Sequence, residues 1–296
     1  MPRAAAAGGR STVASCSITH YLQGGSLNVT GYAPWKRAFA MKSKRLSPPI
    51  RATAWRVATR RTLNGRWLAA HRLTTRCTCA IGSFHLLPQE VLPGARSVIS
   101  WILPVAREVR ESNRRRKDLP SREWALTRTH GETINGDLRR HLVQWLHKSG
   151  YEAIAPQYAP GWKEFGDTPV GIASSWSERH AAYVAGLGTF SLSDGLITAA
   201  GIAHRCGSVV TTLELEPTPR TAPDHRHHCL HYRRSACGAC IARCPVGAIT
   251  REGHDKARCR ELVYGEAPRL VSEAYGVPQT GCGLCQTAVP CEALIP

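Results

Sequence analysis

Three cysteines and a proline in the stretch CGACIARCPVGAI, residues 237–249, follow an order that is typical of iron–sulfur proteins. A cubane [4Fe–4S] cluster takes four thiolates, and in the bacterial pattern C-x2-C-x2-C-x3-C-P the last cysteine ligates the other cluster of a pair. Here Cys237, Cys240 and Cys244, followed by Pro245, supply the last three members of that pattern. The spacing therefore predicts one-electron chemistry, and it requires a further ligand and a second cluster.

The cysteines that could complete two clusters lie on both sides of this stretch. Cys229 lies upstream with a C-x7-C spacing, and Cys259 lies downstream. The C-terminal stretch GCGLCQTAVPCEALIP adds Cys282, Cys285 and Cys291. Together with the first three, these make eight cysteines, which is the number that two [4Fe–4S] clusters require.

The rule that the cysteine before proline ligates the neighbouring cluster divides the eight ligands into two sets. The first set is Cys229, Cys237, Cys240 and Cys291. The second set is Cys244, Cys259, Cys282 and Cys285. Soft thiolates suit iron–sulfur clusters, and short Cys-x2-Cys turns let two sulfurs and several backbone N–H groups face one cube. We expect two adjacent clusters that form a path for single electrons.

A zinc site is the alternative that two Cys-x2-Cys pairs also allow. Zinc would take Cys237, Cys240, Cys282 and Cys285. The other four cysteines of the region would then have no role. The eight ligands and the C-x3-C-P order favour iron–sulfur over zinc.

Basic residues are concentrated at the start of the chain. The sequence has 296 residues and a formal net charge of +18, yet its first 89 residues contain 14 Lys and Arg and no Asp or Glu. An Arg-rich, acid-free composition is typical of organellar transit peptides and of nucleic-acid-binding arms. We expect residues 1–84 to be a basic segment that is disordered or not part of the native protein.

Regular structure is predicted from about residue 85 onward. The strands are predicted over SVISWILPV (97–105), YEAIAP (151–156) and residues 206–216, and a helix over 134–146 ends at Gly150. Strands and helices that alternate in this way predict an α/β fold, with some α+β character. We expect an α/β redox domain over residues 85–220 and a cysteine-rich domain over 221–296.

Neither a membrane span nor a secretion signal is evident in the sequence. It has no run of about 18 apolar residues. Its N-terminus lacks a compact apolar run followed by a small-residue cleavage site. Without a secretion signal, the 12 cysteines indicate metal ligands before disulfides. We expect a cytoplasmic protein that does not bind membranes.

The stretch SSWSERHAAYVAGLG, residues 174–188, predicts a capped helix that ends at its glycines. Gly186 and Gly188 either let the backbone approach a bulky cofactor or only stop the helix and form a turn. They begin a G-x-G-x-x-S sequence, whereas the dinucleotide fingerprint needs G-x-G-x-x-G between a strand and a helix. Both interpretations of the two glycines stay open.

Three parts of the chain together carry a resemblance to a known family: ERHAAYVAGLGTFSLSDGLIT, CGSVVTTLELEPTP and the two-cluster module. Through them, residues 85–296 resemble the epoxyqueuosine reductases, which are related to the cobalamin-dependent reductive dehalogenases. The resemblance implies a nitroreductase-like α/β domain that binds cobalamin, followed by a ferredoxin-like domain with two [4Fe–4S] clusters. It also implies an electron donor protein such as ferredoxin or flavodoxin, and a small-molecule or modified-nucleoside substrate.

Candidates for proton transfer come from comparison with the same family. Its members carry an aspartate in a V-D-x-x-P-x-x-E-R segment, whereas GIASSWSERH has Ile172 at that place and keeps Glu178. Asp167 is the nearest acid, and Tyr183 is an alternative proton donor.

The leading interpretation is an iron–sulfur oxidoreductase that passes electrons through two clusters to a substrate or corrinoid in the α/β domain. The alternative is a non-catalytic, ferredoxin-like electron carrier or partner subunit, which the missing aspartate favours. A weaker alternative is a basic nucleic-acid-binding protein with a zinc site, because phosphate attraction needs only charge. The leading interpretation does not require nucleic acid.

Overall fold

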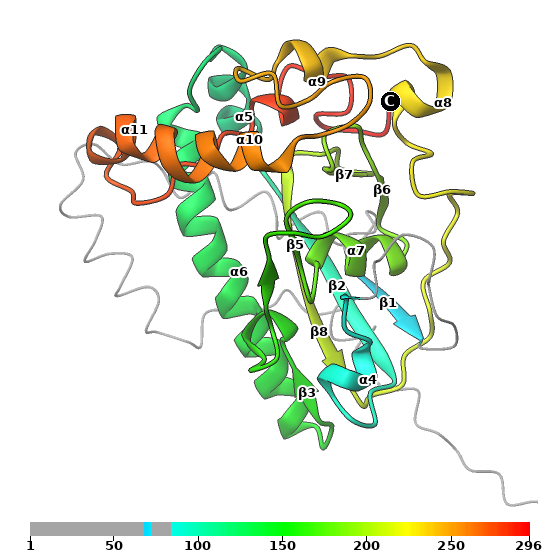
Figure 1. Cartoon of the computed structure of the whole chain (residues 1–296). Coiled ribbons are helices and arrows are strands. Elements are labelled where there is room, and N and C mark those ends of the chain that lie inside the picture. Colours follow the sequence, from blue (N-terminus) through cyan, green and yellow to red (C-terminus); the bar gives the residue numbers. More distant parts are fainter. Residues whose placement is uncertain (1–67, 73–83) are drawn as a thin grey trace, which may run out of the picture. The chain divides into compact units, whose positions relative to one another are not determined.

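The computed structural model describes residues 68–72 and 84–296, which combine helices with small antiparallel sheets in an α+β arrangement (Figure 1). Within these residues, the main sheet has the strand order β1 (Leu68–Arg72), β2 (Ser97–Pro104), β8 (His204–Thr211) and β3 (Ala153–Ile154). Two hairpins pair β4 (Glu164–Phe165) with β5 (Ala173–Ser174), and β6 (Gly188–Phe190) with β7 (Leu196–Thr198). The predicted strands at 97–105 and 206–216 correspond to β2 and β8.

The central strands β2 and β8 are held in register by their buried side chains. The first six residues of β2 are buried, as expected of a strand that is covered on both faces. Trp101 on β2 pairs with Gly207 on β8. A Cβ atom at Gly207 would lie 2.5 Å from two atoms of the Trp101 ring and 2.6 Å from Asn135 Oδ1. The tryptophan therefore requires a glycine opposite it.

We expect Gly207→Ala to lower the free energy of unfolding by about 1–3 kcal/mol, because an added methyl group would overpack this buried contact. Denaturant unfolding of the variant and the parent protein measures the difference. Gly166→Ala is the matched control, since a Cβ there meets nothing within 4 Å. Equal effects of the two substitutions would contradict the prediction.

Helix α6 (Arg122–Lys148) packs along β8 and is longer than the predicted helix over 134–146. It begins after Ser121, whose hydroxyl accepts a hydrogen bond from Trp124 N. Asn135 joins it to the sheet, because its Nδ2 donates to Cys206 O at 2.8 Å and its Oδ1 accepts from the Trp101 indole at 2.9 Å. A buried polar side chain thus sets the position of α6 on the sheet.

The remaining described helices are shorter. They are α4 (Pro88–Val91), α5 (Arg107–Arg114), α7 (Glu178–Val184), α8 (Leu230–Arg234), α9 (Ala239–Ala242), α10 (Lys256–Arg260) and α11 (Ala267–Tyr275), with the single 3-10 turns η2 (Pro156–Tyr158) and η4 (Leu284–Gln286). The π-helical segment η3 (Glu261–Glu266) connects α10 directly to α11. Helix α7 is shorter than the predicted helix over 174–188, because Ser174 pairs in β5. No described helix is long and apolar enough to cross a membrane.

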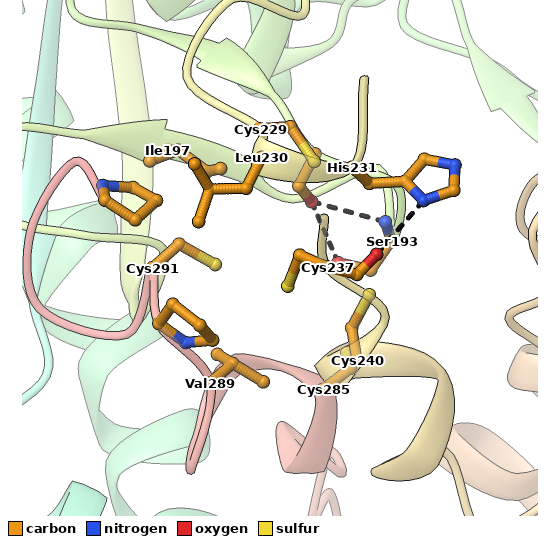
Figure 2. Close-up of a pocket in the computed structure, with 13 residues that line it drawn as sticks. Ser193, Ile197, Cys229, Leu230, His231, Cys237, Cys240, Cys285, Val289 and Cys291 are labelled. Carbon is orange, nitrogen blue, oxygen red and sulfur yellow. Dashed lines mark hydrogen bonds between the residues drawn. The ribbon is translucent and has the colours of Figure 1, made fainter. Parts of the chain in front are cut away.

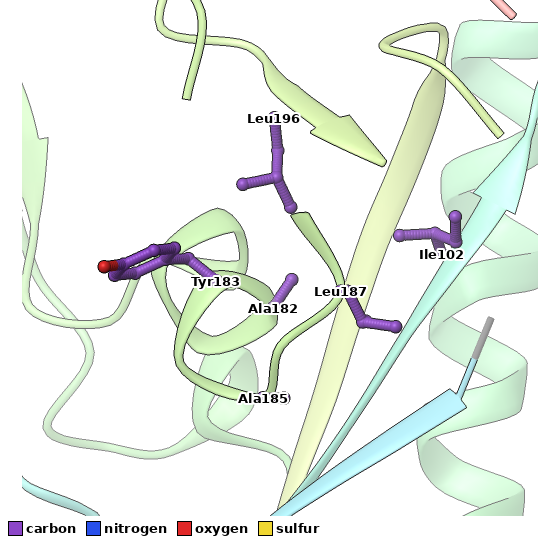
Figure 3. Packing of buried hydrophobic residues seen from close by; sticks show 6 residues of the cluster. All are labelled: Ile102, Ala182, Tyr183, Ala185, Leu187 and Leu196. Carbon is purple, nitrogen blue, oxygen red and sulfur yellow. The ribbon is translucent and has the colours of Figure 1, made fainter. Parts of the chain in front are cut away.

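Apolar side chains pack α7 against the sheet and the β6–β7 hairpin (Figure 3). The buried members of this cluster are Ile102, Ala182, Tyr183, Ala185, Leu187 and Leu196. They come from β2, α7, the turn after α7 and β7, so one small core holds these elements together.

Strand β1 lies inside the segment that was expected to be disordered or not native. Leu68 pairs with Trp101 and Arg72 with Ser97, both antiparallel. These five residues extend the sheet along the edge that β2 offers. The rest of residues 1–83 lies outside the described residues.

The cysteine-rich segment is hydrogen-bonded directly to the β6–β7 region. Phe190 N donates to His225 O at 2.7 Å, and Ile202 N donates to Cys291 O at 2.8 Å. In Figure 1, α8, α9 and the end of the chain lie beside β6 and β7. The hairpin thereby contributes to the position of the cysteines.

Candidate functional site

The first set of cysteines surrounds a single pocket. Its walls include the thiols of Cys229, Cys237, Cys240 and Cys291. Figure 2 shows these sulfurs directed into the shared space, with Ile197 and Val289 beside them. Cys229 directly precedes α8 and Cys240 lies within α9. Helix α8 accounts for most of the residues between Cys229 and Cys237, so both thiols can line the same pocket despite their long spacing in the sequence.

The second set is assembled from three separate elements. Cys244 follows α9, and Cys259 lies in α10. Cys282 lies just before η4, and Cys285 lies within it. Burial, together with the nearby thiols of Cys259 and Cys244, raises the pKa of Cys282 to about 11. Cys285 lines the pocket of the first set as well, so the two sets adjoin at this residue.

All nine described cysteines are free thiols. Burial raises the pKa of Cys285 well above its ordinary value, and it raises the pKa of Cys291 to about 12. Thiols of this kind keep their protons until a metal replaces them. No three His, Cys, Asp or Glu side chains in the described part of the chain converge to hold a single metal ion.

The donors suit a cluster, which is wider than an ion and has its four ligands around it. Backbone amides also reach the sulfurs, since Ala248 N donates to Cys244 Sγ at 3.1 Å. Hydrogen bonds to sulfur are among the factors that set a cluster's reduction potential. Free, soft donors in two adjoining sets, one donor buried and the others half-buried, therefore fit two iron–sulfur clusters.

Arg243, directly before Cys244, connects the second set to the loop between α5 and α6. Its guanidinium donates to Thr287 O at 3.1 Å and to Arg116 O at 2.7 Å. Its positive charge opposes the rise in the pKa of the Cys282 thiol. The sequence analysis missed this residue, and its place beside a ligand in IARCP was the available signal.

Glu292 anchors the C-terminal segment that carries Cys291. Its carboxylate is almost completely buried, lies 2.7 Å from Arg114 Nε and 3.4 Å from Arg110 Nη1, and accepts from Ala288 N at 2.8 Å. The two arginines belong to α5, so the ion pairs hold the segment that contains Cys291 against a helix that is far away in the sequence. The sequence analysis missed Glu292 because its partners are far away in the chain.

Glu178 is the buried carboxyl among the predicted proton-transfer residues. Ser208 donates to its Oε2 at 2.5 Å, and Arg139 Nη2 lies 3.1 Å from its Oε1. Burial raises the pKa of Glu178 to about 7, although Arg139 and Ser208 act in the opposite direction. A carboxyl with this pKa can exchange a proton near neutral pH.

The other two proton-transfer candidates have different surroundings. Tyr183 is buried in the α7 cluster, and the Arg220 guanidinium lies 5.2 Å from the centre of its ring. Asp167 is exposed between β4 and β5. The structure therefore does not bring Asp167, Glu178 and Tyr183 into one buried site.

The two glycines after α7 are closely approached by the chain's own backbone. Gly186 has a φ of +81°, which lets it end the helix, and a Cβ there would lie 3.2 Å from Pro219 O. Gly188 pairs in β6, and its Cβ would lie 2.2 Å from Ile197 O. These two backbone contacts explain why a glycine is needed at each position, and the explanation does not require a cofactor.

His180 on α7 is expected to make the stability of the protein depend on pH. Burial, together with the nearby His85 and Arg179, lowers its pKa from 6.5 to about 3. Its folded-state pKa is below the unfolded value, so the unfolded chain takes up the proton first as pH falls below 6.5. This proton uptake stabilises the unfolded state, so the free energy of unfolding is about 2 kcal/mol lower at pH 5 than it would be without the shift.

We therefore expect His180→Phe to lose less stability than the parent protein between pH 7 and pH 5. Denaturant unfolding at both pH values measures this loss. His141→Phe is the control, because His141 is exposed on α6. Identical pH dependence of the parent protein and His180→Phe would disprove the assignment.

Neither a family model nor a curated protein matches this chain. Solved structures do match it, among them epoxyqueuosine reductases and reductive dehalogenases, the enzymes that the sequence resemblance names. A selenomethionine-labelled epoxyqueuosine reductase is 14% identical over 87% of this chain and 65% of that chain, with a TM-score of 0.48. The enzyme from Bacillus subtilis is 19% identical over 71% of this chain and 52% of that chain, with a TM-score of 0.43.

The catabolic reductive dehalogenase NpRdhA, in complex with 3-bromo-4-hydroxybenzoic acid, is also similar. It is 15% identical over 79% of this chain and 31% of that chain, with a TM-score of 0.48. The chain spans less than two thirds of the length of each of these three proteins.

Proposed function

We propose that this protein is an iron–sulfur oxidoreductase whose eight C-terminal cysteines hold two [4Fe–4S] clusters. The observation that supports this most strongly is the gathering of eight free thiols into two adjoining sets. A [4Fe–4S] cluster supplies one-electron transfer. The first set would hold one cluster and the second set the other, within a ferredoxin-like module.

The residues around the thiols have roles of their own in this proposal. Arg243 places a positive charge and a hydrogen-bonded scaffold beside the second set. Ile197 and Val289 line the first pocket with apolar surface. Apolar walls exclude water, and both burial and hydrogen bonding tune a cluster's reduction potential.

The nitroreductase-like part of the proposal concerns residues 85–220, which carry the candidate substrate site. There, Glu178 is the proposed proton-transfer residue, because it is buried beside Arg139 and has a pKa near neutral. The two glycines do not form a cradle for cobalamin, since the chain's own backbone already approaches them closely. The proposal therefore assigns no residue and no reaction step to a corrinoid.

A non-catalytic electron carrier is the second candidate. Ile172 at the aspartate position of the V-D-x-x-P-x-x-E-R segment and the exposed position of Asp167 favour it. The clusters would serve the same one-electron chemistry, with an acidic redox protein such as a ferredoxin or flavodoxin as partner.

One experiment tests the proposal and separates the two candidates. Iron, acid-labile sulfide, zinc and cobalt are counted on a single sample of the full chain purified without oxygen. We expect about eight iron and eight sulfide per chain. Zinc without sulfide would refute the iron–sulfur assignment. Cobalt retained after cobalamin addition would favour a corrinoid enzyme over the electron carrier.

A further inference from the structure

An exposed basic surface lies between α5 and α6. We call it the basic loop and define it as Arg115, Arg116, Lys117 and Arg122. The first three side chains are exposed and Arg122 is half-buried. Among the described residues, none of the four takes part in an ion pair. Their charges are therefore available to a partner.

The basic loop borders a hollow in the surface. Its walls include Arg115, Arg116 and Arg122, the hydroxyl-bearing Ser121, and Glu123. Asp118 is exposed within the same loop. The surface thus combines a majority of cations with two carboxylates, a pattern that a protein surface bearing both signs of charge can complement. The two carboxylates would weaken the attraction of a row of phosphates, whereas basic side chains of a protein partner could pair with them.

Hydrogen bonds through Asn113 and Arg243 connect the basic loop to the second set of cysteines. Asn113 Nδ2, at the end of α5, donates to Cys282 O at 3.3 Å. The Arg243 guanidinium donates to Asn113 O at 3.2 Å and to Arg116 O at 2.7 Å, and Arg243 precedes the ligand Cys244. A partner that binds the basic loop is therefore separated from the second set by a single layer of hydrogen-bonded residues.

Two arginines near the first set make contacts within the chain. The Arg226 guanidinium lies 4.2 Å from the centre of the Tyr232 ring. Arg233 Nη2 donates to Pro296 O at 2.9 Å. These contacts engage Arg226 and Arg233, whereas Arg234 is exposed. None of the four basic-loop side chains has an ion-pair partner in the described part of the chain.

We propose that the basic loop is the docking surface for an acidic, one-electron carrier protein. Complementary charge steers such encounters and increases their rate, and it loses strength as salt screens it. The proposal rests on the proposed redox function, because the second set gives the carrier a reason to dock at this place. The docking itself depends only on the charges of the basic loop.

The test measures binding of an acidic flavodoxin to the full chain by isothermal titration calorimetry at about 50 and 200 mM salt. The variant reverses two exposed charges, Arg115→Glu with Lys117→Glu. The matched control is Arg233→Glu with Arg234→Glu on α8, which changes the same number of charges. The basic segment before residue 90 is common to all three proteins, so its attraction is the same in each comparison.

We expect the basic-loop variant to bind about tenfold more weakly at the lower salt concentration, with a smaller difference at the higher one. The α8 control should bind like the parent protein. Equal affinity of the parent protein and the basic-loop variant would overturn the proposal, and so would a larger loss in the control.

A short RNA stem-loop is titrated in parallel. If the basic-loop variant loses RNA affinity and keeps flavodoxin affinity, the surface binds nucleic acid and the proposal is overturned. The metal content of the same samples tests the redox function separately. Loss of flavodoxin affinity in a chain that lacks iron and sulfide would support the docking surface and refute the proposed function.

Discussion

Replacing Cys237 and Cys291 together by alanine is expected to leave about four iron and four sulfide per chain, the same as either single replacement. Both thiols line one pocket, so the second substitution removes a ligand from a site that the first has already disabled. The second set keeps all four of its thiols. Iron and acid-labile sulfide, counted on protein purified without oxygen, measure the outcome.

The paired variant Cys237→Ala with Cys244→Ala removes one ligand from each set. We expect it to retain almost no iron, because both clusters lose a ligand. Division of the ligands in chain order, with Cys229 to Cys244 on one cluster and the later four on the other, would exchange these two results. Cys206→Ala is the control and should keep all the iron, since that thiol lies in β8 and belongs to neither set.

Glu292→Ala is expected to lower the free energy of unfolding by about 3 kcal/mol. The substitution leaves the Arg110 guanidinium half-enclosed without its carboxylate, since only 16% of that side chain is exposed. It also removes the acceptor of Ala288 N. Because Glu292 follows Cys291, the variant should release iron from the first set faster than the parent protein when a chelator is added.

Denaturant unfolding and the rate of iron release check both parts of this prediction. Glu273→Ala is the matched control, because Glu273 is an exposed acid on α11. It should change stability by no more than about 0.5 kcal/mol. An unfolding midpoint for Glu292→Ala equal to that of Glu273→Ala would show that the buried ion pairs do not hold the C-terminal segment.

Local patterns predicted the central strands of the sheet well. SVISWILPV is apolar and β-branched, and the structure places β2 over all but its last residue. The long helix was predicted only in its second half. Its first half is buried against residues that come much later, such as Val277, and no regular apolar spacing within the helix reveals that contact.

The glycines after α7 show why a motif alone leaves two interpretations. A glycine is required wherever a Cβ would collide, and the sequence does not say what it would collide with. At Gly188 the collision is with Ile197 O, across the β6–β7 hairpin. Only the pairing of these two strands distinguishes that contact from the approach of a cofactor.

By itself, the sequence determined the kind of donors and their number. Residue type and short spacings such as Cys-x2-Cys are local properties, and they indicate soft thiolate chemistry before any folding is considered. Only the tertiary structure decided which thiols share a pocket, and that Glu292 and Arg243 hold their surroundings in place. The reason is that Cys229 and Cys291 lie far apart in the chain, and they meet only because the C-terminal segment returns to the β6–β7 hairpin and α5.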